Sequence, residues 1–174
     1  MKKEENTQRK DELQTLRDWF SYNTFVRKRY LGFLARFPRN AINKDRGASY
    51  PSILDIFTHV LDVYKSWFNL YEKGENLPEL KGLSLEEVKK LERDVDEYLH
   101  NFMQNVTLAD LNRAFQYSYG KGKNRKIIKR VLVDMLWHLV EEELQHRGEM
   151  NALLWQDDID PPVTSWFRWK RSLK

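Results

Sequence analysis

One stretch decides the fold: MLWHLVEEELQHRGEM, residues 135–150. It predicts a long helix, because residues suited to a core recur at spacings of three and four along one face. At two of those positions a carboxylate and an imidazole replace apolar side chains, and burying a polar group without a partner costs roughly 2–7 kcal/mol. A metal ion is the most economical way to compensate them. The predicted buried stripe comprises Ile128, Leu132, Met135, Leu139, Glu142, His146, Met150 and Leu153.

Length and composition point to a single globular domain. The chain has 174 residues, of which 41% are hydrophobic and 13% aromatic, so it is long enough to bury a core. We expect a flexible tail over residues 1–10 and one domain over 11–174. The absence of cysteine excludes disulfides, thiolate metal sites and a cysteine nucleophile. No apolar run approaches the ~20 residues that cross a bilayer, and the polar start lacks a secretory signal, so we expect a cytoplasmic protein without membrane contact.

Helical periodicity extends over most of the chain. Proline ends the first helix at Pro38, a capping box of Ser84 and Glu87 begins the third, and Gly74 suits the end of the second. Residues 113–125 alternate aromatic and polar side chains before a glycine-rich turn, which predicts an extended ribbon or an ordered loop. Four long helices without strong strand patterns predict an all-α four-helix bundle. The expected helices cover about 11–37, 49–73, 85–106 and 126–156, with polar connectors at 39–48 and 75–83.

The candidate ligands follow from helix geometry. Glu142 and His146 lie four residues apart, so their side chains can converge on one ion, and His59 can approach from the second helix. Two imidazoles and one carboxylate leave coordination positions open, as catalytic zinc and non-haem iron sites do. His138 extends the row by one turn, and we expect it beside the site rather than bound to the ion. Spacing alone favours an internal hydrogen-bonded His–Glu pair over a metal site. The phase of the stripe turns Glu142 inward and leaves its two glutamate neighbours pointing sideways.

These residues resemble a known family. The segment His146-Arg147-Gly148-Glu149, with a ligand-type residue four positions before it, is similar to the signature of the DinB/YfiT-like superfamily. The similarity extends over about residues 13–163. It includes Asn23 in the first helix, Ser49-Tyr50-Pro51-Ser52-Ile53 ahead of His59, and Asp160-Pro161-Pro162 after the last helix.

The resemblance implies a four-helix bundle, often a homodimer, that holds a divalent metal through three histidines. His59 and His146 match two of those positions, whereas the third falls on Glu142. Glutamate also binds zinc, nickel or iron, so we expect one of these ions. Some relatives are metal-dependent thiol transferases or isomerases, so the resemblance implies a metal-dependent hydrolase or thiol transferase that acts on a small molecule.

Three alternatives remain open at this point. Glu97 with His100 and Glu143 with His146 form two Glu-x-x-His motifs of the di-iron type, although the other helices offer no central glutamate. A non-catalytic dimeric bundle would fill the polar row with hydrogen bonds. The basic cluster from Lys121 to Arg130, close to tyrosines, suits single-stranded nucleic acid, but we favour a solvated loop there and expect no nucleic-acid partner.

Overall fold

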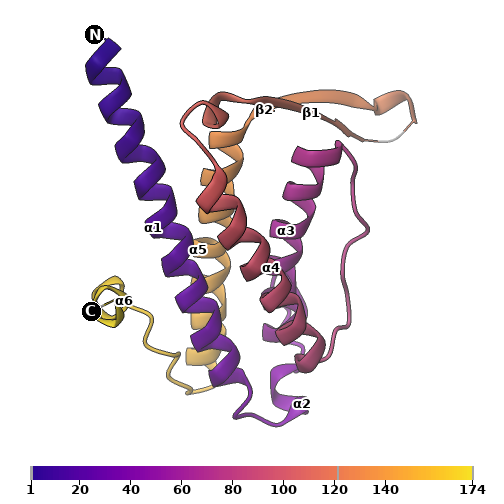
Figure 1. Cartoon of the computed structure of the whole chain (residues 1–174). Helices are drawn as coiled ribbons and strands as arrows, with labels where there is room; N and C mark the ends of the chain where they lie inside the picture. Colours follow the sequence, from indigo (N-terminus) through magenta and orange to yellow (C-terminus); the bar gives the residue numbers. More distant parts are fainter. Residues whose placement is uncertain (1, 121, 174) are drawn as a thin grey trace.

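The structure is a computed structural model that describes residues 2–120 and 122–173, with side chains described from residue 11 onward. Four long helices form the bundle, and a two-stranded hairpin lies across one end of it (Figure 1). The elements are α1 (Lys2–Leu34), α2 (Arg39–Ile42), α3 (Ile53–Lys73), α4 (Leu85–Asn105), η1 (Asp110–Asn112), β1 (Ala114–Tyr119), η2 (Gly122–Asn124), β2 (Lys126–Val131), α5 (Leu132–Gln156) and α6 (Trp166–Ser172). The prediction of a mostly helical bundle is confirmed.

In chain order, the four long helices run down, up, up and down along the bundle. α1 and α5 run in one direction, α3 and α4 run in the other, and the long connector after α3 returns along the bundle to the start of α4 (Figure 1). α3 packs most extensively against α5. One apolar core fills the space between the helices, and its fully buried members include Leu16, Ile56, Leu61, Leu132 and Leu139.

Local sequence signals set most of the helix ends. The Ser52 hydroxyl accepts the Asp55 amide at the start of α3, and Gly74 ends that helix with a φ of 69°, a left-handed conformation that favours glycine. Ser84 and Glu87 form the expected capping box at the start of α4. The end of α3 and both ends of α4 are therefore those predicted from the sequence, whereas α3 begins at Ile53 and not within residues 49–52, where its opening was predicted.

Three other predicted boundaries need correction. The last helix begins at Leu132 rather than at Lys126, because the β-branched residues before it pair with β1 as strand β2. Ile128 therefore lies opposite Tyr117 on the hairpin and not on the helical stripe. The connector at 39–48 contains the short helix α2, and α1 begins at Lys2, so the backbone of residues 2–10 is helical. Flexibility of that segment stays a prediction.

The hairpin and the C-terminal segment were predicted incompletely. Arg113–Arg125 was expected to form a ribbon or loop, and its first half is strand β1, antiparallel to β2. The aromatic tail folds back as α6, where Trp166 and Trp169 pack against Tyr22 of α1. No described helix meets the length and hydropathy that a membrane span requires.

Candidate metal centre

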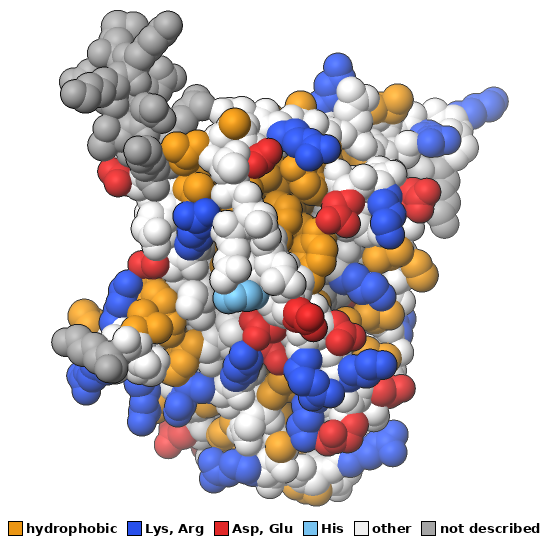
Figure 2. Space-filling model, viewed as in Figure 1, with side chains coloured by type: hydrophobic (Ala, Val, Ile, Leu, Met, Phe, Trp, Pro, Cys, Tyr) orange, Lys and Arg blue, Asp and Glu red, His pale blue; other side chains and the backbone are white. Residues whose placement is uncertain are grey.

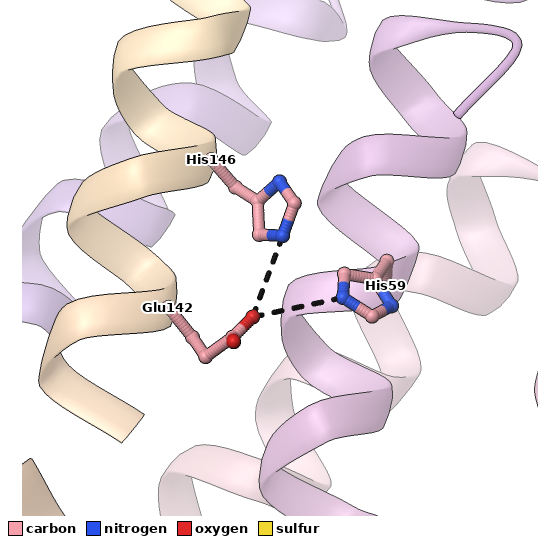
Figure 3. Close-up of side chains that lie close together, drawn as sticks. All are labelled: His59, Glu142 and His146. Carbon is pink, nitrogen blue, oxygen red and sulfur yellow. Dashed lines mark ion pairs between the residues drawn. The ribbon is translucent and has the colours of Figure 1, made fainter. Parts of the chain in front are cut away.

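α3 and α5 bring the three candidate ligands together. His59 comes from the second turn of α3, and Glu142 and His146 come from adjacent turns of α5 (Figure 3). The Glu142 Oε2 atom lies 3.4 Å from His146 Nε2 and 3.8 Å from His59 Nε2. One donor atom from each residue lies within 4.8 Å of the other two. The sequence thus identified a real spatial cluster, although His59 and Glu142 are 83 residues apart in the chain.

Each imidazole is oriented through its other nitrogen. The Tyr50 hydroxyl lies 2.6 Å from His59 Nδ1, and a Glu149 carboxylate oxygen lies 3.0 Å from His146 Nδ1. A neutral imidazole with its proton on Nδ1 donates to these oxygens and leaves the Nε2 lone pair free. Both Nε2 atoms point toward Glu142. Such hydrogen bonds to the far nitrogen are typical of metal-bound histidines, because they fix the tautomer and the ring direction.

The connector before α3 secures this arrangement. The backbone amide and hydroxyl of Ser49 donate to the two oxygens of Glu149 at 2.9 and 2.7 Å. The Tyr50 ring stacks on His59 with centroids 4.2 Å apart. Burial opposes ionisation of Glu149, but the hydrogen bonds from Ser49 and His146 outweigh it and lower the pKa of this carboxyl. Glu149 is therefore an ionised acceptor that holds His146 against the connector.

The electrostatics of the cluster favour a neutral His59 beside an acid without a Lys or Arg partner among the described residues. Burial, together with the nearby His146 ring, lowers the pKa of His59 despite the opposing charge of Glu142. Glu142 has three imidazoles as its ion-pair neighbours, and no Lys or Arg lies within 4 Å of it in the described part of the chain. Its carboxylate is 24% exposed. The described residues supply no permanent positive charge at this point.

The donor set fits a divalent transition metal. Zinc binds imidazole nitrogen and carboxylate oxygen at about 2.0–2.2 Å, and donors at that distance around a tetrahedral ion lie about 3.3–3.6 Å apart. The two separations from Glu142 Oε2, 3.4 and 3.8 Å, are close to this range, and all three donor atoms lie within 4.8 Å of one another. Free Nε2 lone pairs, fixed Nδ1 atoms and an acid without a cation all agree with an ion at their shared point.

His138 lies beside the cluster, where it was expected. Its Nε2 atom is 3.7 Å from Glu142 Oε1, the oxygen that faces away from the other two histidines. The ring meets Trp67 of α3 edge-on at 5.1 Å. His138 is half-exposed, so it borders the open side of the cluster toward the hairpin.

Glu143 is the main correction at the site. It was expected to point sideways, yet it is 3% exposed and forms a 2.8 Å ion pair with the buried Arg27 of α1. Tyr64 also donates to it at 2.7 Å. This pairing removes Glu143 from the di-iron alternative, and His100 of the other Glu-x-x-His motif lies exposed on α4 beside Gln104. The di-iron interpretation is therefore wrong.

Comparison with known proteins identifies the family of the chain and supports its fold. The model of the DinB family matches residues 6–170. The chain belongs to the DinB family. The crystal structure of a DinB-like protein from Bacillus cereus ATCC 10987 superposes with a TM-score of 0.62 at 17% identity, covering 86% of this chain and 96% of the other. That likeness supports the shared bundle fold. Curated protein sequences give no significant match.

Two residues of this DinB protein's site were not predicted as its supports. Tyr50 and Glu149 both lie inside the segments that carried the resemblance, but only the ligands were singled out from the sequence. The spacing of three between His146 and Glu149 places both on one helical face, and this was the available signal for Glu149. Tyr50 gave no such signal, because its approach to His59 depends on the path of the connector.

Proposed function

We propose that this DinB protein binds one divalent metal ion through His59, Glu142 and His146 and acts as a metal-dependent hydrolase or thiol transferase on a small molecule. The observation that carries the proposal is the convergence of two oriented Nε2 atoms on the same carboxylate oxygen. Zinc, nickel and iron all accept this donor set.

The chain's own residues would prepare the site for such chemistry. Tyr50 and Glu149 lie within hydrogen-bond distance of the two Nδ1 atoms, and as acceptors of Nδ1 protons they would keep both Nε2 lone pairs free for an ion. Three protein donors leave coordination positions open, and a bound ion there lowers the pKa of a water molecule or an incoming thiol. Since the protein has no cysteine, any thiol must arrive with the substrate. The open side borders His138 and Trp67, which would contact the substrate first.

The experiment is metal analysis of protein purified without chelator or histidine tag. We expect about one divalent ion per chain in the wild type and loss of most of it in His146→Ala. The matched control is His100→Ala, which removes an exposed histidine on α4 outside the cluster and should retain full occupancy. Equal occupancy in the two variants would exclude these residues as ligands.

The same samples test the competing non-catalytic bundle. A specific ion stabilises the folded state by about 2.7 kcal/mol at one hundred times its dissociation constant, which corresponds to roughly 5–11 °C for a chain of this size. A chelator should therefore lower the melting temperature of the wild type and leave His146→Ala unchanged.

We further propose a homodimer, which light scattering on the wild type tests directly. A metal-free dimer that does not respond to the chelator would favour the non-catalytic function.

A further inference from the structure

We propose that the β1–β2 hairpin is a binding surface for single-stranded nucleic acid, independent of the metal centre. The first observation is the distribution of charge along the chain. Residues 111–133 contain seven Lys and Arg and no Asp or Glu. Because the whole chain carries a net charge of +4, the remaining residues together carry −3. The basic character of the protein therefore resides entirely in this one segment.

The structure places the tip of that segment beyond the body of the bundle. The hairpin crosses the end of the bundle and its tip extends beyond α3 (Figure 1), and Figure 2 shows Lys and Arg side chains at its outer end. Its described basic residues are exposed: Lys123, Arg125, Lys126, Lys129 and Arg130. Lys121, which belonged to the predicted basic cluster, lies outside the described residues.

The described basic residues of the hairpin form no ion pairs with the described carboxylates, and their side-chain hydrogen bonds are to uncharged oxygens. Arg125 donates to the Ser118 hydroxyl, and Arg130 donates to the Lys129 carbonyl. Among the residues that the structure describes, no carboxylate lies within ion-pair distance of Lys126, Lys129 or Arg130. An unneutralised basic strand attracts a polyanion, because phosphates release condensed counterions when they bind Lys or Arg.

Aromatic residues that share a face with two of the basic residues favour a single strand over a duplex. Lys126 and Arg130 lie on the tyrosine face, and Lys129, which pairs with Gln116, lies on the other face. Tyr117 and Tyr119 alternate on β1, and the register pairs Tyr119 directly with Lys126, so their side chains share one face. Tyr117 is occupied, since its ring packs edge-on against Trp67 at 5.5 Å. Tyr119 lies beyond that contact and is 68% exposed. An exposed ring beside a lysine can stack one unpaired base while the lysine contacts its phosphate.

The hairpin is held firmly enough to present these groups. Phe115 is buried and meets Tyr71 of α3 edge-on at 5.4 Å. The Asn76 side chain, in the connector after α3, donates to the Ser118 carbonyl at 3.0 Å. The base of the hairpin is thus fixed to the bundle, and the outer end with Tyr119 and Lys126 is displayed to solvent.

The test is fluorescence anisotropy of the full chain with a labelled oligothymidylate of about 20 nucleotides, long enough for several contacts. Affinity should fall as salt rises. The variant Lys126→Gln/Lys129→Gln/Arg130→Gln should lose on the order of tenfold or more in affinity, and its salt slope should decrease by about 2. The control Lys65→Gln/Lys81→Gln/Lys90→Gln removes the same charge from exposed positions outside the hairpin and should bind like the wild type.

Stacking is tested separately at Tyr119. Tyr119→Ala should weaken binding roughly 5- to 150-fold, whereas Tyr119→Phe should restore it because the ring suffices. Circular dichroism and metal occupancy, unchanged in every variant, would show that the fold and the metal centre are intact. Equal binding by the two triple variants would overturn the proposal. A preference for duplex of the same length, or for phosphatidylserine vesicles over the oligonucleotide, would overturn it as well.

Discussion

Two adjacent glutamates on α5 enter two different polar clusters. Glu143 faces the interior, where Arg27 of α1 and Tyr64 of α3 both contact its Oε2 atom. Glu142 faces the open side of α3 and α5, where its neighbours within ion-pair distance are three imidazoles. The chain supplies a cation, Arg27, to the buried Glu143. Among the described residues, the partly exposed Glu142 has no Lys or Arg within ion-pair distance. The difference distinguishes a structural ion pair from a site arranged for a charge that comes from outside.

The interior cluster joins all four long helices. Arg27 is 1% exposed, and its Nε atom lies 3.8 Å from a carboxylate oxygen of the buried Glu92 on α4. Burial alone would lower the pKa of Arg27, but the charges of Glu143, Tyr64 and Glu92 raise it further than burial lowers it. For Glu92, burial outweighs Arg27 and raises the pKa of the carboxyl. The Arg27 guanidinium therefore remains charged and lies within ion-pair distance of both Glu143 and Glu92.

The largest expected effect follows from removing that cation. Arg27→Met leaves Glu143 buried without its partner, and breaking a buried pair in this way costs about 3–5 kcal/mol. Urea unfolding at neutral pH measures the loss of stability. Arg93→Met, which removes an exposed arginine of α4, should change stability by no more than about 0.5 kcal/mol. A loss below about 1 kcal/mol in Arg27→Met would show that the interior cluster is not a coupled ion pair.

An intermediate effect is expected at the support of the open cluster. Glu149→Gln retains the size of the side chain but replaces an ionised acceptor of the His146 Nδ1 proton, so metal affinity should fall about 10- to 100-fold. Calorimetric titration of the metal-free protein with zinc measures this change. Glu141→Gln alters an exposed glutamate one position before Glu142 and should leave the affinity within about twofold. If both variants bind zinc alike, Glu149 does not orient the ligand.

The smallest effect concerns pH and the metal-free protein. The pKa of His59 is lowered in the folded state, chiefly by burial and then by His146. The unfolded chain therefore binds more protons at this residue as pH falls below about 6.5. Well above a pH of about 6.5, His59 therefore does not change the free energy of unfolding with pH. As the pH drops through about 6.5, protonation of His59 in the unfolded chain lowers the free energy of unfolding.

Unfolding measurements between about pH 7.5 and 5.5 check the sign. The stability of the chelator-treated wild type should decrease more steeply toward acid than that of His59→Gln. His100→Gln, which removes an exposed histidine, should follow the wild-type curve. A His59→Gln curve parallel to the wild type would mean that the cluster does not disfavour protonation of His59.

The bundle was largely predictable because local signals and periodicity agreed. The capping box at Ser84 and the left-handed Gly74 fixed two boundaries, and the spacing of Glu142 and His146 fixed the centre of the site. The start of α5 was not predictable from periodicity, because residues 126–131 satisfy the helical stripe and also form a strand once β1 is available. Pairing between segments decided that case.

The environment of Glu143 depended on information spread over the chain. Within α5 alone, three consecutive glutamates indicate a solvated face, and nothing local separates the second from the third. The useful signal lay in α1, where Asn23 and Arg27 interrupt an apolar row at a spacing of four. A buried arginine requires an acid opposite it. Which acid meets it depends on the rotation of α5 relative to α1, a tertiary property.

The long separation of His59 from Glu142 along the chain has a consequence for folding. Glu142 and His146 can approach each other in any helical turn, but the third donor arrives only after α3 has docked on α5. A chain that has not made this long-range contact offers an ion two donors at most from the set, and closing so long a loop is entropically costly. Metal uptake should therefore report completion of the tertiary structure, and separation of these two helices should release the ion before the helices themselves unwind.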